Sequence, residues 1–429
     1  MSTPPAAPAT PAPRDPRYLR RLLVLLSSAT FFEGYDNFVL AFVLALVLGD
    51  LGGSETDAAW IRAITSLGAV AAFVLAAQAD RIGRKRLLLI TIAGYTIAGA
   101  LTALSPGLVW LTVAQFAAQI FIGAEWAVAI TIVVEEFPRE RRGRALGIVT
   151  SMNTLGGIFV GILAFVGLTS TPLGWRAFYV VALLPLLLIA YGRRSMLETE
   201  RYEAVRIDTR GTHLDHTSLW EAWRPEYRVT IVAVGLVTFF RYFVVSAAAF
   251  WWAYFAQREV GMSVSSSGLY LAAAGLVGAL GFIVAGRLMD RIGRKLAFLA
   301  YMAGALVFGT WMFQIDDPAT MLPVLCIGIF FSLGSVAMTS AFSTEPFPTY
   351  VRSRASAWCR NAFEIPGGVL GALTVGVLGD HVSGSIGSIG DAMSLVTVAM
   401  LPAAMVVSWL FVPETNAEDM VAMDEAVLA

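Results

Sequence analysis

Charge is scarce in this sequence. Only 14% of its 429 residues are charged, whereas 57% are hydrophobic and the mean hydropathy is +0.70. An ordinary soluble protein carries roughly 25% charged residues, and each helix that crosses a bilayer core of about 30 Å needs about 20 apolar residues. Because long uncharged runs occupy most of the chain, the composition excludes a soluble globular protein and indicates a polytopic membrane protein.

Cysteine and histidine are also scarce. The two cysteines, Cys326 and Cys359, both lie inside apolar runs, so we expect packing residues rather than a disulfide framework or a zinc site. His213 and His216 are spaced to hold a metal together, but a third ligand is not apparent, and we interpret them as part of a solvated loop. The sequence therefore predicts no metal and no cofactor. The net charge of −1 gives no reason to expect a nucleic-acid partner.

A cleavable signal peptide is missing as well. Residues 1–16 are rich in Pro and Ala and are predicted to form a disordered cytoplasmic tail. Lipid cannot hydrogen-bond the backbone, so each membrane span must satisfy its own amide groups as a helix. The predicted fold class is an all-α membrane protein with twelve transmembrane helices. They are expected at about 20–48, 58–79, 87–105, 108–134, 145–168, 175–191, 227–256, 264–285, 296–314, 319–343, 355–379 and 391–412.

Lysine and arginine gather on one side of the predicted spans. If the N-terminus is cytoplasmic, 25 of the 30 lie in the tail, the even-numbered loops and the long central segment. The opposite loops hold only Arg62, Arg176 and Arg258, and Arg241 and Arg360 lie within spans. Because cationic loops are retained in the cytoplasm, both termini are predicted to be cytoplasmic, in a multi-pass protein of the cell (plasma) membrane.

A single long polar stretch divides the spans into six and six. Residues 192–226 are predicted to be a cytoplasmic linker with short amphipathic helices. The domains that follow are an N-terminal six-helix bundle at 17–191, a C-terminal six-helix bundle at 227–412 and a cytoplasmic tail at 413–429. The sequence shows no oligomer interface, and we expect a monomer.

One motif occurs in both predicted bundles. The segment DRIGRK at 80–85 recurs at 290–295, identical at all six positions and shifted by 210. At the same offset, Glu135, Pro138, Arg142 and Arg144 recur as Glu345, Pro348, Arg352 and Arg354. Two unrelated loops that share one shift indicate a duplicated six-helix unit. Two such halves suit a transporter, whose substrate site lies at their interface while the halves rock around it.

The repeated loop D-R-x-G-R-K resembles the signature of the major facilitator superfamily, and the resemblance covers all twelve spans. It implies two pseudo-symmetric six-helix bundles that work by alternating access. In the first copy an acid ends span two where cations begin span three, so the charges can bridge the helix ends, and a glycine allows the tight turn. These charges either gate one face or only set the topology. The residues expected to act as gates or struts are Asp80, Arg81, Gly83, Arg84, Lys85, Glu135, Arg142 and Arg144, and in the second half Asp290, Arg291, Gly293, Arg294, Lys295, Glu345, Arg352 and Arg354.

Span one contains two acids in the string Glu33-Gly34-Tyr35-Asp36. At a spacing of three, Glu33 and Asp36 share a helix face. Two acids held close in a low dielectric do not both ionise easily, which is what proton coupling requires; the alternative is a helix end or an ion pair with a neighbouring helix. The string resembles the D-G-Y-D pattern in the first helix of the aromatic acid:proton symporters. The resemblance implies proton coupling by both acids, and Tyr35 is a candidate substrate contact.

Span four carries Gln119 and Glu125. Gln119 occupies the place where many relatives of those symporters have an arginine that pairs with the first-helix acid, and it is a candidate substrate contact. Glu125 resembles the acid of the G-G-E pattern in metabolite:proton symporters. It is predicted to be a second proton site, a ligand for a substrate donor, or a member of a structural ion pair.

Span seven contains Arg241 among aromatic residues that include Trp252. The arginine needs a counter-charge, which Asp36, Glu125 or a substrate carboxylate can supply. The aromatic run favours a flat or apolar ligand, although aromatic residues also gather at helix ends for interfacial reasons.

Span eleven contains Arg360 and Glu364, an i, i+4 pair on one helix face. Either the two satisfy each other, or Arg360 holds a substrate carboxylate, as the similarity to related porters implies. Asn361 is a weaker polar candidate for substrate binding.

These features together predict a secondary symporter that takes up a small organic anion, an aromatic or other carboxylate, with protons. The string P-E-T at 413–415 resembles the end of the sugar porters, and a sugar or an organic cation is the alternative cargo. Span five lacks the Gly-Pro pair of the drug:proton antiporters, which disfavours efflux. The gate loops of both halves disfavour a non-transporting receptor. The sequence shows no nucleophile paired with a base, so an enzyme is not indicated.

Overall fold

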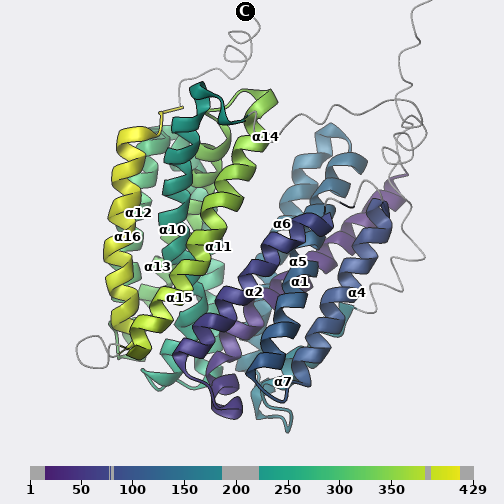
Figure 1. The fold of residues 1–429 in the computed structure, drawn as a ribbon, viewed down its shortest axis with the longest axis vertical. Helices are drawn as coiled ribbons and strands as arrows, with labels where there is room; N and C mark the ends of the chain where they lie inside the picture. Colours follow the sequence, from purple (N-terminus) through teal and green to yellow (C-terminus); the bar gives the residue numbers. More distant parts are fainter. Residues whose placement is uncertain (1–14, 77, 79–81, 186–221, 382–387, 416–429) are drawn as a thin grey trace, which may run out of the picture.

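The computed structural model describes residues 15–76, 78, 82–185, 222–381 and 388–415. Within these ranges the protein is helical and has no strand, which confirms the predicted all-α class (Figure 1). The predicted N-terminal tail, most of the predicted linker with His213 and His216, and the side chains of Asp80 and Arg81 lie outside the described residues.

The helices form two groups that stand side by side in Figure 1. The first group contains α1 (Pro16–Leu51), α2 (Glu55–Ala76), α4 (Arg84–Ala103), α5 (Leu108–Glu136), α6 (Arg139–Phe165), the 3₁₀ turn η1 (Leu168–Ser170) and α7 (Arg176–Val181). The second contains α10 (Pro225–Arg258), α11 (Val264–Ile292), α12 (Arg294–Trp311), α13 (Pro318–Thr344), α14 (Thr349–Trp358), the π-helix η3 (Cys359–Glu364), α15 (Ile365–His381) and α16 (Ile389–Phe411). We call them the first and the second bundle.

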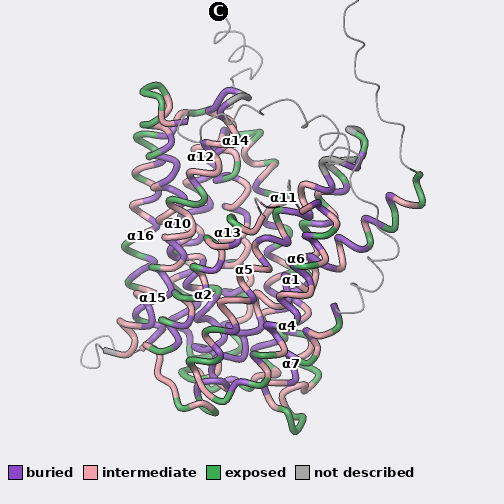
Figure 2. Tube along the Cα trace, turned by 45° about the vertical axis from the view of Figure 1, so that its right-hand side comes forward, coloured by how far each residue is buried: buried purple, intermediate pink, exposed green. Residues whose placement is uncertain are grey.

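Ten helices of the described part of the chain are long and apolar enough to cross a membrane. The exceptions among the predicted spans are the sixth, of which only α7 is described, and the ninth, which is the shorter α12. Exposed positions recur along the outer faces of the helices (Figure 2), and many are large and apolar: Val74, Val109 and Leu410 are 65%, 81% and 62% exposed. We expect this apolar outer surface to contact lipid.

Glycines set how closely the helices cross. A Cβ atom built on Gly34 of α1 would lie 2.0 Å from the carbonyl oxygen of Asn153 on α6, and one on Gly156 of α6 would lie 2.0 Å from that of Phe31. In the second bundle, a Cβ on Gly371 of α15 would likewise lie 2.0 Å from a backbone oxygen of α10. Only glycine fits at such crossings, so Gly34 fixes α1 against α6 at the position where its two acids lie.

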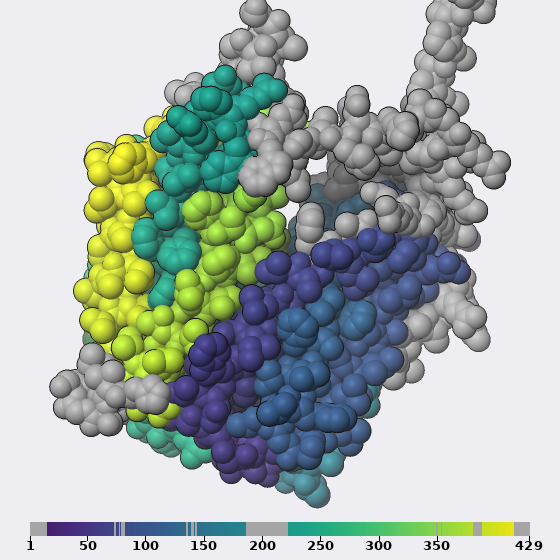
Figure 3. All heavy atoms as spheres, viewed as in Figure 1, coloured from purple at the N-terminus to yellow at the C-terminus, as the bar shows by residue number. Residues whose placement is uncertain are grey.

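The two bundles meet at one end and separate at the other. Figure 3 shows them in contact where α1 ends and α2 begins, which we call the closed end, and apart at the end that carries α14, the open end. At the closed end the Tyr254 hydroxyl donates to Glu55, the Thr56 hydroxyl donates to Asp380, and Arg258 Nη2 donates to a carbonyl oxygen of α1 at 2.8 Å. Gln257 Nε2 of α10 also donates to a carbonyl oxygen of α1, at 3.3 Å.

Candidate functional site

The acids predicted for proton coupling lie inside the first bundle. Glu33 of α1 is 5% exposed and Glu125 of α5 is completely buried. Glu125 has a larger electrostatic effect on Glu33 than Asp36 has. Both oxygens of Glu125 lack a hydrogen-bond partner among the described residues. The acid with the largest electrostatic effect on Glu33 is therefore Glu125, on another helix. The sequence had suggested Asp36, the second acid of the E-G-Y-D string.

Asp36 and Gln119 occupy the same region without pairing. One carboxylate oxygen of Asp36 is buried and lacks a hydrogen-bond partner in the part of the chain that the structure describes. The Gln119 amide instead donates to the Asn37 side chain at 3.3 Å. Gln119 is uncharged, and its partner is the Asn37 amide. It therefore does not give Asp36 the positive charge that an arginine at this position would provide.

Arg360 lies in the second bundle. It is exposed, it acts electrostatically on Glu33, and its side chain makes no hydrogen bond or ion pair with another described residue. Its neighbour Asn361 is also exposed and donates to the carbonyl of its own helix, at Ala357, over 2.8 Å. A buried acid of the first bundle and an exposed arginine of the second thus lie within electrostatic reach of each other.

A π-helix places Arg360 in this position. The predicted single helix of span eleven is interrupted over Cys359–Glu364 by a π-helix. Pro366 follows directly and has no amide hydrogen to continue the α-helical pattern, which is a common cause of such a break. The wider turn changes the i, i+4 relation between Arg360 and Glu364, and π-helical turns occur frequently at functional sites.

Glu364 pairs with the other membrane arginine. Its carboxylate lies 3.5 Å from Arg241 Nη2, and Arg241 is only 1% exposed. Arg241 Nη1 also donates to the Ser335 hydroxyl at 3.4 Å. The predicted Arg360–Glu364 pair is therefore replaced by an Arg241–Glu364 pair between helices. Arg241 is thereby compensated within its own bundle and is not presented to the opening.

Tyr35 is not brought to the space between the bundles. Its side chain is completely buried, and its hydroxyl donates to the Phe178 carbonyl at 2.8 Å. The tyrosine of the E-G-Y-D string thus ties α1 to α7 inside the first bundle. Its burial follows from the packing of α7 against this part of α1.

An apolar cavity of about 240 Å³ lies between the bundles. Phe38 and Phe42 of α1 and Trp252 of α10 form part of its walls, together with Asn153 of α6 and Ser332 of α13. The Trp252 indole nitrogen is buried and has no hydrogen-bond partner among the described residues. Since an indole N–H is a donor only, the cavity offers aromatic faces and one free donor to a ligand.

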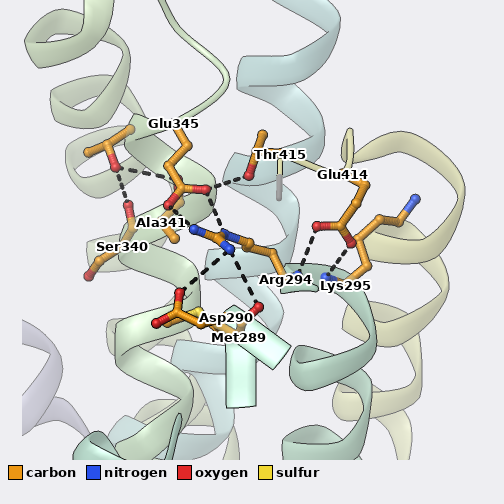
Figure 4. A network of polar contacts seen from close by, with 10 residues as sticks. Met289, Asp290, Arg294, Lys295, Ser340, Ala341, Glu345, Glu414 and Thr415 are labelled. Atoms are coloured by element: carbon orange, nitrogen blue, oxygen red, sulfur yellow. Dashed lines mark hydrogen bonds and ion pairs between the residues drawn. The ribbon is translucent and has the colours of Figure 1, made fainter. Parts of the chain in front are cut away.

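The predicted gate loops join helices within a bundle. In the second bundle Arg294 Nε lies 3.0 Å from Glu345 Oε2, while Glu414 accepts from the backbone amides of Arg294 and Lys295 at 2.8 and 3.0 Å (Figure 4). Gly293 and its repeat equivalent Gly83 have φ values of 89° and 98°, as their tight turns demand. The network connects the ends of α11, α12, α13 and α16.

The other gate residues are placed as follows. Arg352 Nε donates to the carbonyls of Thr344 and Phe347 at 3.1 Å, and Asp290 lies 3.7 Å from Arg294. Arg84 and Lys85 begin α4, Arg144 lies in α6, Arg291 in α11 and Arg354 in α14. The side chains of Glu135 and Arg142 lie outside the described residues.

Several polar contacts were not anticipated from the sequence. The closed-end pairs of Glu55 and Asp380 involve residues that look like ordinary helix ends, and Asn37 follows directly after the E-G-Y-D string. Glu414 belongs to the P-E-T string, which we used only as a resemblance. A sequence signal existed for Glu414 alone, because that acid stands immediately after the last span.

Known proteins share this architecture. The chain is 25% identical over 416 residues to the niacin transporter NiaP of Acinetobacter baylyi (strain ATCC 33305 / BD413 / ADP1), covering 90% of this chain and 92% of the relative. It is 23% identical over 396 residues to the cis,cis-muconate transport protein of the same strain, covering 90% and 94%. A crystal structure of a D-xylose-proton symporter matches with a TM-score of 0.76 at 18% identity, covering 94% of this chain and 99% of that one.

The family model agrees with these relatives and with the fold. It matches residues 26–372, which include most of both bundles. Relatives over nearly the full length are transporters and not enzymes. The protein is a membrane transporter, and the chain belongs to the Major Facilitator Superfamily.

Proposed function

We propose that this transporter imports a small organic carboxylate together with protons, by alternating access between its two bundles. The observation that carries the proposal is the placement of the buried acids Glu33 and Glu125 in the first bundle, with Arg360, exposed in the second bundle, within electrostatic reach of Glu33. The named cargo of the relatives described above, niacin and cis,cis-muconate, supports an acid as the substrate class.

Each group has a part in the proposed cycle. Arg360 is exposed and unpaired among the described residues, so its guanidinium is available to hold a carboxylate through two parallel hydrogen bonds. The buried Glu33–Glu125 pair resists double ionisation, and it takes up and releases the proton, with Asp36 beside it. The apolar cavity at Trp252 receives the ring or chain of the substrate.

The structure supports one state of this cycle. The cleft opens at the end where Arg84 and Arg294 begin their helices, and we propose that this end and both termini face the cytoplasm. The closed-end contacts of Glu55 and Asp380 then seal the outer side. In the opposite state these contacts break and the halves close at the basic end. We propose that the monomer is the working unit.

Uptake into liposomes under an imposed pH gradient tests the proposal, with radiolabelled nicotinate and cis,cis-muconate and with D-xylose as a neutral comparison. We expect acid accumulation that disappears with the gradient. Glu33→Gln should abolish accumulation but retain exchange of labelled for unlabelled acid, whereas Glu226→Gln, an exposed acid at the start of α10, should behave as wild type.

Arg360→Lys tests the anchor in the same assay. Because a point charge does not replace a bidentate fork, the apparent affinity for the acids should fall about tenfold or more. Uptake of D-xylose alone, or acid uptake that ignores the pH gradient, would overturn the proposal.

A further inference from the structure

Arg62 is a membrane arginine that the function described so far does not use. Its charge was counted with the loops, although the predicted span at 58–79 includes it, and the structure places it two turns into α2, inside a candidate membrane span. Its guanidinium carbon lies 5.6 Å from the ring centre of Phe250 on α10. The side chain therefore crosses from the first bundle to the second, on the closed-end side of the cleft.

One face of α10 meets this arginine. Tyr242, Ser246, Phe250 and Tyr254 follow one another at intervals of four, so they lie on the same face of the helix. Tyr254 donates to Glu55 in the first turn of α2, which fixes this face against α2. Two turns further along α2, the Arg62 guanidinium lies over the Phe250 ring, and Ser246 and Tyr242 follow one and two turns beyond Phe250 on α10.

Polar groups at this face lack hydrogen-bond partners among the described residues. The Nε of Arg62 and the hydroxyl of Ser246 are shielded from solvent and have no hydrogen-bond partner among the described residues. Tyr242 acts electrostatically on Arg62, and Arg62 makes no ion pair with an acid among the described residues. An arginine has donors only, so nothing described in its surroundings satisfies its charge.

This distinguishes Arg62 from the other arginines near the cleft. Arg241 has Glu364 at 3.5 Å, and Arg360 acts on Glu33 across the opening. A shielded arginine without a counter-charge is costly inside a membrane, and buried donors without acceptors call for a partner. The partner that satisfies a guanidinium and two hydroxyls together is an anion with several acceptor oxygens.

We propose that Arg62, Tyr242 and Ser246 form a second carboxylate-binding subsite, separate from Arg360 and closer to the closed end. The guanidinium receives the carboxylate through a bidentate contact, the two hydroxyls donate to its oxygens, and the Phe250 ring packs against the ligand. This inference rests on the proposed function, since it requires an acid as substrate.

Direct binding to purified protein in detergent tests the subsite, with nicotinate and cis,cis-muconate as acids and nicotinamide as the neutral isostere. We expect Arg62→Gln to weaken acid binding roughly ten- to hundredfold, as the loss of a charged hydrogen bond implies, and to leave nicotinamide binding unchanged. Arg62→Lys should fall between the two. Ser246→Ala and Tyr242→Phe should each weaken acid binding severalfold.

Arg176→Gln is the matched control, because that arginine lies at the same end but pairs with Asp50 inside the first bundle. It should bind the acids as wild type does. If Arg62→Gln weakens the binding of the acids and of nicotinamide equally, the arginine has a structural role only. If Arg62→Gln binds the acids as wild type does, the arginine does not contact them. Either result overturns the subsite and leaves the proposed substrate class standing. A wild type that binds none of the acids overturns the proposed substrate class and the subsite with it.

Discussion

The substitution Gly34→Ala tests how the helix crossing supports the acid pair. The new Cβ would lie 2.0 Å from the Asn153 carbonyl oxygen, where ordinary contact begins at 3.4 Å. The atoms involved are backbone on both helices, so α1 and α6 must separate by about 1 Å or more. Forcing extra atoms into a packed interior costs about 1–3 kcal/mol, and the helix preference of alanine returns at most about 1 kcal/mol.

A net loss of about 1–2 kcal/mol lowers the melting temperature by roughly 2–8 °C, taking 2–4 °C for each kcal/mol in a domain of 150–250 residues. The assay is thermal unfolding in detergent, followed by proton-driven uptake of nicotinate in liposomes. We expect uptake to fall as well, because the shift of α1 displaces Glu33 from Glu125.

Gly147→Ala is the control for this prediction. A Cβ at Gly147 of α6 would meet nothing within 4 Å, so this variant should be as stable as wild type or slightly more stable. If Gly34→Ala melts with Gly147→Ala and transports normally, the argument that close backbone contact at Gly34 positions the acids is refuted.

Three further predictions concern polar contacts. Glu364→Gln should destabilise the protein by about 3 kcal/mol, because it leaves Arg241 buried without its charge partner; adding Arg241→Met should restore much of the loss in the same melting assay. Glu55→Gln should weaken the contact with Tyr254 by about 1.5–3 kcal/mol and raise hydrogen exchange at the closed end, and unchanged exchange there would contradict a sealing role. Glu345→Gln should cost about 1 kcal/mol, since the bidentate contact that it disrupts is partly solvent-exposed, and a melting temperature equal to wild type would show that the contact contributes nothing.

The sequence was sufficient for the helices because lipid leaves little choice. A span of about 20 apolar residues must be helical to satisfy its backbone, and caps such as Asp317 and the left-handed Gly52 mark the ends. The turn at Gly83 was predictable for the same local reason, since a tight turn between two helix ends needs a positive φ. The break in span eleven was missed although Pro366 was visible.

Partners of charged side chains were much harder to predict. The spacing suggested that Glu33 interacts with Asp36 and Arg360 with Glu364. In the structure, Glu125 has the larger electrostatic effect on Glu33, and Glu364 forms an ion pair with Arg241. Periodicity relates residues within one helix, whereas these partners lie on different helices whose relative rotation depends on packing at glycine crossings. Tyr35 was misplaced for that reason too, because only the position of α7 shows what its hydroxyl can reach.

The sequence by itself determined that this chain crosses the membrane repeatedly, that it is built from two related halves and which ionisable residues lie inside them, because hydropathy, repetition and residue type are properties of the chain. Only the tertiary structure decided which end is closed and which arginine pairs with an acid. Those outcomes depend on contacts between helices far apart in sequence, as between Arg62 and Phe250, and no local pattern encodes the angle at which two helices meet.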